Sequence, residues 1–295
     1  MGLRKRYGQR VALADLTFSA GPGEVIGLLG PNGAGKTTAI RLLSTVIRPD
    51  GGEFTIAGVP SGRPVEIRRR VGVLPESAGY PANQTGAGYL RYHARLFGLD
   101  RASAGRVARA LLAEVGLADR ADSRIGGYSR GMRQRLGIAR ALVNEPAVVF
   151  LDEPTLGLDP AGQRQVLDLI RAMARDRGAT VVLSTHTLPD VEEVCGRVII
   201  LHRGRVRAAG SVADVVRAVG ARRTARVRVP VEHVERAAAL LSDVDSVDEA
   251  TGELRFSAAD GTDGALRALL DRGVPVLSYD VEGARLSEAF LEVTV

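Results

Sequence analysis

The chain has 295 residues, of which 45% are hydrophobic, and its formal net charge is +6. It contains no run of 18 apolar residues, and its first ten residues lack an apolar stretch, so we expect neither a membrane span nor a signal peptide, and a cytoplasmic location. A single cysteine, Cys195, excludes an internal disulfide framework and is expected to be a core residue.

The positive charge comes almost entirely from arginine, because lysine occurs only at Lys5 and Lys36. A net positive charge is compatible with an anionic partner. The abundance of arginine, alanine and glycine, however, indicates a GC-rich genome as much as a binding surface. Where arginine fills nearly every basic position, a remaining lysine suggests a place that needs a compact ammonium.

Residues 30–38, GPNGAGKTT, match the phosphate-binding pattern G-x-x-x-x-G-K-[ST]. The run EVIGLL at 24–29 predicts a buried strand before this loop, and apolar residues at helical spacing predict a helix after it. Glycines let backbone N–H groups curl around phosphates, Lys36 can reach the outer phosphates, and the Thr37 hydroxyl can ligate Mg²⁺. The expected nucleotide-binding residues are Gly30, Pro31, Asn32, Gly33, Ala34, Gly35, Lys36, Thr37 and Thr38.

Two stretches beside this loop, 11–20 and 51–60, read as strands of a small antiparallel sheet. Farther on, residues 83–122 show two or three helical stripes, which predict a helical subdomain at about 78–135. Four aromatic residues gather there and are open to two interpretations, contacts with a partner or core packing: Tyr80, Tyr89, Tyr92 and Phe97.

Residues 128–135, YSRGMRQR, place a serine and a glycine at the start of a predicted helix. From the residue types alone, Ser129 is expected to cap this helix, which stabilises it by about 1 kcal/mol.

Two further apolar runs, AVVFLDEP at 147–154 and ATVVLSTH at 179–186, read as buried strands that end in polar residues. Asp152 is placed to hold the water shell of Mg²⁺, and Glu153 to polarise an attacking water. His186 ends the next strand at the edge where parallel sheets gather ligands, so it is expected to contact the terminal phosphate.

Taken together, GPNGAGKTT, YSRGMRQRLGIARAL, VVFLDEPTLGLDP and STH resemble, in order and spacing, the nucleotide-binding subunits of ABC transporters over residues 1–215. The resemblance implies an ATPase that uses ATP and Mg²⁺, forms a homodimer and powers a separate membrane permease from the inner face of the membrane. It also implies that residues 129–132 form the signature motif, which faces the ATP of the partner subunit through Ser129, Arg130, Gly131 and Met132.

Other positions carry roles by the same resemblance. Tyr7 is expected to stack on adenine, and Asp159 to couple the two sites across the dimer. Glu76 stands where the family usually has glutamine, so it is expected either to ligate Mg²⁺ or to face the permease. Arg130 and Met132 also depart from the commonest signature, and Arg130 is expected either to add a cation near the partner's phosphate or to be solvated. These departures resemble the subgroup that drives drug, lipid or polysaccharide exporters of the ABC-2 kind, including antibiotic self-resistance ATPases similar to the daunorubicin type.

After a linker at 216–223, residues 224–295 alternate between strand and helix patterns and predict a small ferredoxin-like α+β domain that ends in a helix at 286–293. The predicted fold is therefore α/β: a P-loop NTPase core of the RecA-like kind at 1–215 with an antiparallel β subdomain and a helical subdomain, followed by this accessory domain. The alternative function is a non-transport ABC ATPase that acts on nucleic acid or the ribosome. No nucleic acid is expected as a partner, because the interval before the signature lacks sustained heptads.

Overall fold

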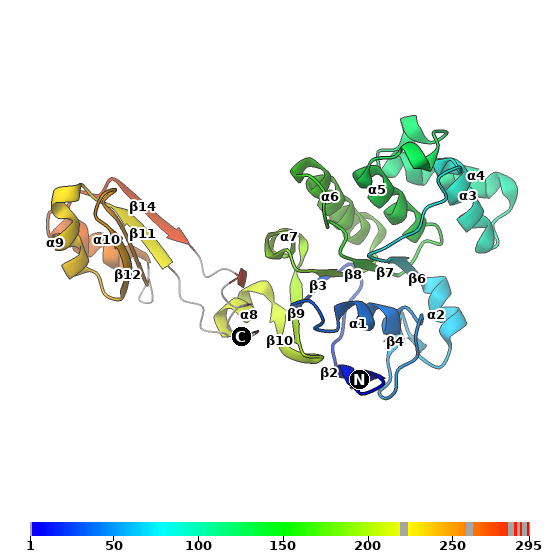
Figure 1. Ribbon diagram of the computed structural model, residues 1–295, viewed down its shortest axis with the longest axis horizontal. Coiled ribbons are helices and arrows are strands. Elements are labelled where there is room, and N and C mark those ends of the chain that lie inside the picture. Colours follow the sequence, from blue (N-terminus) through cyan, green and yellow to red (C-terminus); the bar gives the residue numbers. More distant parts are fainter. Residues whose placement is uncertain are drawn as a thin grey trace. The chain divides into compact units, whose positions relative to one another are not determined.

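The computed structural model describes residues 2–218, 224–257, 262–282, 286–287, 290 and 294. The chain divides into two compact units, Met1–Val212 and Ala213–Val293 (Figure 1). In the stretch expected to be a linker, residues 216–218 belong to helix α8 (Val212–Ala218), and 219–223 lie outside the described residues. Most of the helix expected at 286–293 lies outside them too.

Eight strands form the main sheet of the larger unit. They are β1 (Leu3–Tyr7), β2 (Arg10–Leu16), β3 (Val25–Leu29), β6 (Val71–Leu74), β7 (Val148–Asp152), β8 (Thr180–Thr185), β9 (Arg197–His202) and β10 (Arg205–Ser211). Their order is β1-β2-β10-β9-β3-β8-β7-β6. The central neighbours β9, β3, β8, β7 and β6 are parallel, whereas β1 pairs with β2, and β9 with β10, in antiparallel fashion.

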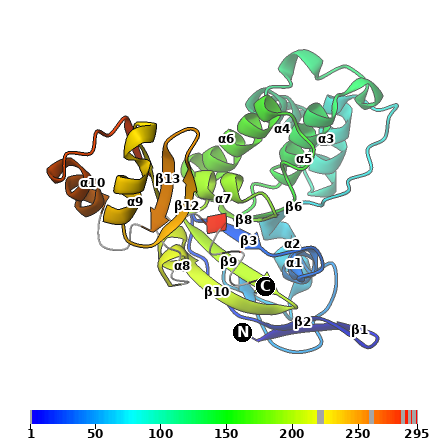
Figure 2. The same ribbon diagram turned by 60° about the vertical axis from the view of Figure 1, so that its left-hand side comes forward.

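Helices cover both faces of this sheet (Figures 1 and 2). Helix α1 (Lys36–Leu43) lies on one face, and α5 (Arg130–Ala141), α6 (Pro160–Arg177) and α7 (Leu188–Val194) lie on the other. Strands β3 and β8 are buried at every residue, as strands between two helical layers must be.

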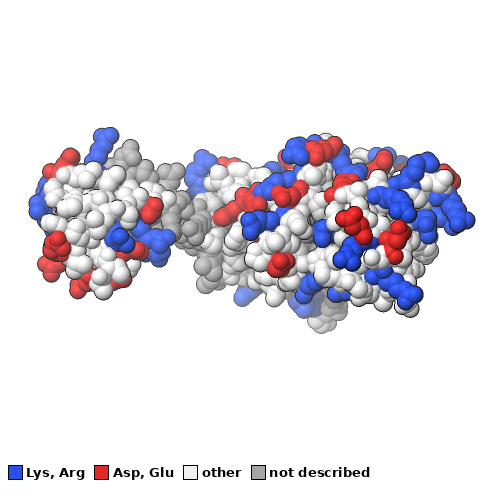
Figure 3. All heavy atoms as spheres, turned by 90° about the horizontal axis from the view of Figure 1, so that it is seen from above, with Lys and Arg blue, Asp and Glu red and all other residues white. Residues whose placement is uncertain are grey.

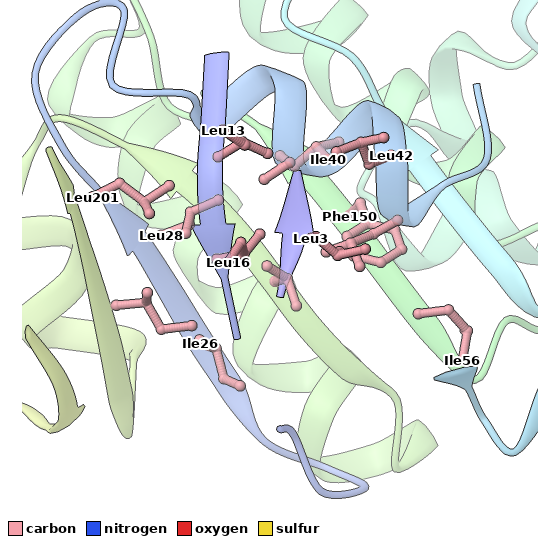
Figure 4. Packing of buried hydrophobic residues seen from close by; sticks show 14 of the residues in the cluster. Leu3, Leu13, Leu16, Ile26, Leu28, Ile40, Leu42, Ile56, Phe150 and Leu201 are labelled. Atoms are coloured by element: carbon pink, nitrogen blue, oxygen red, sulfur yellow. The ribbon is translucent and has the colours of Figure 1, made fainter. Parts of the chain in front are cut away.

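The core beneath α1 is made of aliphatic side chains and Phe150, and it draws on the main sheet, on α1 and on the small two-stranded sheet (Figure 4). It includes Leu3, Leu13, Leu16, Ile26, Leu28, Ile40, Leu42, Phe150 and Leu201. Because each fully buried side chain of this size contributes about 1.5–3 kcal/mol, the strand before the glycine loop and the helix after it are held firmly.

The stretches 11–20 and 51–60 do not form one sheet, contrary to the sequence-based expectation. Strand β2 joins the eight-stranded sheet, while β4 (Thr55–Ile56) and β5 (Val59–Pro60) form a separate two-stranded sheet. An isolated β-bridge joins Arg4 of β1 to Gly51, which precedes β4 in the chain. Short alternating strands do not specify their pairing partners, so this division could not be predicted from their pattern.

Five helical segments separate β6 from the end of α5 and confirm a helical region there. Before α5 they are α3 (Gly86–Leu96), α4 (Arg101–Glu114) and the 3₁₀ turns η1 (Ala118–Arg120) and η2 (Ile125–Gly127). Thr85 and Asp100 cap α3 and α4 by accepting bonds from backbone N–H groups. With 11 and 14 residues, these two helices are far too short for the coiled coils that the nucleic-acid alternative requires.

The four aromatic residues of this region divide between core and surface. Tyr89 is 5% exposed and packs beside Tyr80, with ring centroids 5.8 Å apart. Tyr92 and Phe97 are exposed by 56% and 43%. Core packing therefore accounts for the first pair, and only the second pair is available to a partner.

The smaller unit contains a four-stranded antiparallel sheet in the order β12-β13-β11-β14. Its elements are β11 (Thr224–Arg228), η3 (Val231–His233), α9 (Val234–Leu240), β12 (Val244–Asp248), β13 (Glu253–Ser257), α10 (Thr262–Asp271) and β14 (Ser278–Glu282). The chain order β-α-β-β-α-β with this strand order is the ferredoxin-like arrangement. Strand β12 carries the polar sequence VDSVD and is exposed at four of its five residues.

Positive and negative side chains are interspersed on the face of the larger unit that Figure 3 shows. Among the described helices, none has the length and apolar character of a transmembrane span. Cys195, the single cysteine, is buried, and burial raises the pKa of its thiol to about 12.

Candidate functional site

The candidate site lies where four neighbouring parallel strands end. The glycine loop follows β3, Asp152 ends β7, His186 comes directly after β8, and Glu76 comes shortly after β6. Because β6, β7, β8 and β3 are adjacent and parallel, their carboxyl ends share one edge of the sheet. In open α/β sheets, ligands bind at this edge.

The glycine loop has a backbone that other residues could not adopt. Gly30, Gly33 and Gly35 have φ angles of 155°, 82° and 112°. A Cβ atom at Gly35 would lie 2.6 Å from the carbonyl oxygen of Ala12. The loop therefore passes close to β2. Its backbone N–H groups lie at the N-terminus of α1, where they can bind phosphate.

Lys36, the first residue of α1, folds back over the loop. Its ammonium donates a hydrogen bond to the carbonyl oxygen of Gly30 at 2.7 Å and lies 3.8 Å from Oε1 of Glu153. The side chain is only 7% exposed. A buried ammonium with a carbonyl and a carboxylate as neighbours is positioned to exchange one of them for an anionic phosphate oxygen.

Asp152 is 2% exposed and faces two hydroxyl groups. Thr37 Oγ1 lies 3.3 Å from its Oδ1, and Ser184 Oγ donates a short hydrogen bond to the same oxygen. Oxygen donors are the ligands that Mg²⁺ prefers, and this ion usually takes one or two protein groups together with substrate phosphates and water. The pair of Thr37 and Asp152 fits such an ion. Among the described residues, no cluster of three or more His, Cys, Asp or Glu forms a larger metal site.

Glu153 follows Asp152 with a φ of 51°, an uncommon angle for a residue other than glycine. Its backbone N–H donates to the carbonyl oxygen of Ser184 at 3.0 Å. Its Oε2 lies 2.9 Å from Nδ1 of His186, whose side chain is half exposed. The carboxylate is thus held between an imidazole and the Lys36 ammonium, at the mouth of the loop.

Residues 129–132 open helix α5 on the helical side of the sheet. The Ser129 side chain accepts a hydrogen bond from the backbone N–H of Met132 at 3.2 Å, so the capping role is present. Ser129 and Arg130 are exposed, and a Cβ atom at Gly131 would meet nothing closer than 4.0 Å. This helix start is open to a ligand or to a second chain.

Arg130 is not simply solvated. Its guanidinium lies against Gly157, where an added Cβ atom would come within 2.6 Å of Cζ. Four residues later on the same helix, Gln134 donates to the carbonyl oxygen of Pro154 at 2.7 Å. Both contacts connect α5 to the turn that follows Glu153.

Three predicted residues lie at the margins of this site. Tyr7 is 46% exposed at the end of β1, with the Lys5 ammonium 5.9 Å from its ring centroid. Asp159 accepts from the N–H of Gly162 at 3.3 Å and caps α6, which begins with Pro160. Glu76 is exposed in the segment after β6.

Three residues near the carboxylates were not singled out from the sequence. Ser184 lies inside the motif STH and could have been noticed as a hydroxyl two residues before His186. Thr155 and Asp190 form a buried hydrogen bond of 2.6 Å. No spacing or period connects the last two, because their contact arises only from the tertiary fold.

Comparison with known proteins adds a consistent set of similarities. A family model described as "ABC transporter" matches residues 13–156. The chain is 37% identical to "Daunorubicin resistance ATP-binding protein DrrA2" of Streptomyces coeruleorubidus over 300 residues, which cover 99% of this chain and 93% of that protein. It is 40% identical over 210 residues to "Nod factor export ATP-binding protein I" of Burkholderia thailandensis, which covers 71% and 69% of the two chains.

Among solved structures, "Structure of ATP binding subunit of ABC transporter" is similar with a TM-score of 0.67 and 35% identity, over 74% of this chain and 91% of that one. The similarity to DrrA2 extends through both units of the chain, since it covers nearly the whole length.

Proposed function

Because the chain belongs to the ABC transporter family of ATP-binding proteins, we propose that it is the subunit that binds and hydrolyses ATP to power an exporter. The observation that carries this proposal is the convergence of Lys36, Asp152, Glu153 and His186 at one edge of the sheet. The arrangement supplies a phosphate cradle, a carboxylate beside a hydroxyl, and a second carboxylate near the place where a γ-phosphate would lie.

In this proposal the chain's own residues divide the work. The N–H groups of the glycine loop and the Lys36 ammonium bind the phosphates and disperse their charge. Thr37 and Asp152 hold Mg²⁺, which when bound neutralises charge on the phosphate oxygens. Tyr7 offers a flat exposed ring to adenine.

Glu153 orients the attacking water and accepts its proton as the water oxygen bonds to the γ-phosphorus and the bond to the β-phosphate oxygen breaks. His186, 2.9 Å from the Glu153 carboxylate, holds that carboxylate in place and contacts the γ-phosphate. The Lys36 ammonium, 3.8 Å from Oε1 of Glu153, attracts this carboxylate electrostatically before ATP arrives.

Residues 129–132 serve the ATP of a second copy of the chain. Two observations support this role. The Ser129 hydroxyl and the open space at Gly131 lie at an exposed helix start. Within the chain, Arg130 contacts the turn at Gly157 and not the glycine loop. The positive end of α5 favours an anion. Asp159 and Glu76 then transmit closure of this dimer between its two sites and to the membrane partner.

The membrane partner is a separate permease of the ABC-2 kind, with the chain attached to the cytoplasmic face of the membrane through it. The relatives that support export are named for daunorubicin resistance and for Nod factor export. The proposed cargo is a drug, or else a lipid or polysaccharide, the other classes that the motifs of this chain suggest. The exposed Tyr92 and Phe97 on the helical region are available for a helix of the permease.

A mixing experiment tests the shared site. Ser129→Ala leaves the glycine loop intact, and Lys36→Ala leaves the signature intact. Each variant alone should hydrolyse MgATP very slowly. A mixture of the two should regain a substantial part of the wild-type rate, because mixed dimers contain one complete site. If the mixture shows only the mean of the two separate rates, each chain works by itself and the proposal fails.

A further inference from the structure

Thr155 and Asp190 form a polar pair in the interior of the larger unit. Thr155 Oγ1 donates a hydrogen bond of 2.6 Å to Asp190 Oδ2, and the two residues are 2% and 6% exposed. Thr155 lies two residues after Glu153, in the turn between β7 and α6. Asp190 is the third residue of α7 and lies four residues after His186. Each member is therefore close in sequence to one of the two groups that form the 2.9 Å contact at the site.

Packing alone does not explain this pair. Burial, and to a lesser degree the charge of Glu193, raises the pKa of the Asp190 carboxyl, while the Thr155 hydroxyl and the nearby His186 act in the opposite direction. Two apolar side chains of similar size would fill the same space without the cost of removing a carboxyl group from water. A hydrogen bond fills this space as well, and in addition it fixes the distance and direction between the two segments.

The pair is one of three residue pairs that join the segment after β7 to the end of β8 and to the segment that follows it. First, the N–H of Glu153 donates to the carbonyl oxygen of Ser184 at 3.0 Å. Second, the Glu153 carboxylate contacts the His186 imidazole at 2.9 Å. The third is the Thr155–Asp190 bond, which is the most deeply buried of the three. Together the three connections form a closed ring of contacts that includes the Glu153 carboxylate.

The first two connections alone hold Glu153 and His186 weakly, so the Thr155–Asp190 bond is needed. Glu153 has a left-handed backbone, which is unfavourable for a residue with a side chain and persists only when its surroundings hold it. His186 is half exposed, so its contact with Glu153 is open to competition from water. The Thr155–Asp190 pair is buried, so water does not compete with it, and it limits the movement of both Glu153 and His186.

We propose that Thr155 and Asp190 are positioning residues, which hold the Glu153 carboxylate and the His186 imidazole in register for ATP hydrolysis without touching the nucleotide. The proposal rests on the roles proposed above for Glu153 and His186. It assigns a function in the reaction to two buried residues that lie behind the site.

Two sets of near-isosteric variants separate the hydrogen bond from packing. Thr155→Ser keeps the hydroxyl and Thr155→Val keeps the shape. Asp190→Asn keeps an oxygen acceptor, and Asp190→Leu keeps the approximate volume. Turnover and MgATP affinity should be measured on the full chain at a temperature where all the variants are folded.

Thr155→Val and Asp190→Leu should lower kcat by about 10- to 100-fold, because a small misplacement of a catalytic group costs rates of this order. Their affinity for ATP should stay within about twofold of the wild type, since the phosphate cradle is unchanged. Thr155→Ser and Asp190→Asn should keep most of the turnover. Ring signals of His186, one of four histidines, should move in nuclear magnetic resonance spectra of Thr155→Val and stay in place in Thr155→Ser.

Wild-type turnover in folded Thr155→Val would overturn the proposal, as would equal losses in Thr155→Val and Thr155→Ser, which would indicate packing. If Thr155→Val does not fold, the comparison of Asp190→Asn with Asp190→Leu decides in the same way. Glu153→Gln is measured in parallel: if it keeps full turnover, the proposed function itself fails, whereas loss in Glu153→Gln with none in Thr155→Val removes only the positioning role.

Discussion

The Lys36 ammonium lies 2.7 Å from the carbonyl oxygen of Gly30, so this side chain closes over the loop that precedes its own helix. The contact places a buried positive charge where phosphates would enter. We predict that Lys36→Ala weakens MgATP binding by at least 10-fold, because the charge-assisted contacts to the outer phosphates are lost. Equilibrium binding of a fluorescent ATP analogue measures the effect.

The chain offers a matched control for this prediction, since its other lysine, Lys5, lies on β1 and pairs with Asp50. Lys5→Ala removes the same charge and should weaken ATP binding much less than Lys36→Ala does, through a shift of Tyr7, whose ring centroid lies 5.9 Å from the Lys5 ammonium. Equal losses in the two variants would show that net charge, and not the position of Lys36, controls binding.

Glu153 provides a second test, because its carboxylate is held by His186 and by the Lys36 ammonium. Glu153→Gln should lower kcat by on the order of 10² or more while ATP still binds, since the amide cannot accept the proton of the attacking water. Steady-state hydrolysis and ATP binding are compared. Glu66→Gln, in α2 (Pro64–Arg70), where Glu66 forms an ion pair with Arg63, should hydrolyse at the wild-type rate. Unchanged turnover in Glu153→Gln would remove this residue from the mechanism.

The parts of the fold that the sequence predicted are those in which residue type is dictated locally. Gly30 and Gly35 have positive φ angles, so only a glycine-rich motif is compatible with the loop. Asp159 and Pro160 cap and begin α6, and Gly178 ends it with a φ of 63°. These are short-range signals, and the strand and helix predicted on either side of the glycine loop are β3 and α1.

What could not be predicted depends on contacts between distant residues. Whether 11–20 pairs with 51–60 is decided by the whole sheet and not by either strand. The bonds from Ser184 to Asp152 and from Thr155 to Asp190 join residues 32 and 35 positions apart. Side chains at such separations carry no common period, so only the folded chain reveals that they meet.

Ser129 both caps α5 and is proposed to contact the partner's phosphate, and these two roles can be separated. Ser129→Ala should cost about 1 kcal/mol of stability through the lost cap and, in addition, should reduce hydrolysis by at least 10-fold. Thr85→Ala is the control: Thr85 caps α3 by accepting from the N–H of Gly88 at 3.0 Å. It should lose similar stability and keep its turnover. If both variants hydrolyse ATP equally well, Ser129 is only a cap.

Strand β1, which carries Tyr7, is hydrogen-bonded to Asp50. The Asp50 carboxylate accepts hydrogen bonds from the Lys5 ammonium at 2.8 Å and from the backbone N–H of Arg6 at 2.7 Å. The bond from Lys5, and then that from the Arg6 backbone, hold the pKa of Asp50 below its ordinary value of 3.8. A carboxyl whose pKa is lowered by folding stabilises the fold above the unfolded value and loses that contribution as pH falls through the folded one.

Asp50→Asn should therefore be less stable than the wild type near pH 7, and the difference should shrink as pH falls below about 4. Urea unfolding followed at several pH values between 7 and 3 gives this comparison. A difference that stays constant with pH would mean that the amide substitution acts through packing and not through the charge of Asp50.

Tyr80 and Tyr128 allow a comparison of how an unbonded and a hydrogen-bonded tyrosine hydroxyl affect the free energy of unfolding. Among the described residues, no hydrogen-bond partner reaches the buried hydroxyl of Tyr80, and burial raises the pKa of this group to about 12. The hydroxyl lies against Gly137 of α5, where a Cβ atom would clash with it. The Tyr128 hydroxyl, in contrast, donates to the carbonyl oxygen of Arg120 at 2.6 Å.

Removing the two hydroxyls should change stability in opposite directions. Tyr80→Phe should leave the free energy of unfolding unchanged or raise it by about 1 kcal/mol, because a desolvated and unbonded group is removed. Tyr128→Phe should lower it by about 1 kcal/mol, because a hydrogen bond is lost and the Arg120 carbonyl is left behind. Urea unfolding of the larger unit measures both values. A loss in Tyr80→Phe as large as that in Tyr128→Phe would mean that the Tyr80 hydroxyl is hydrogen-bonded in solution.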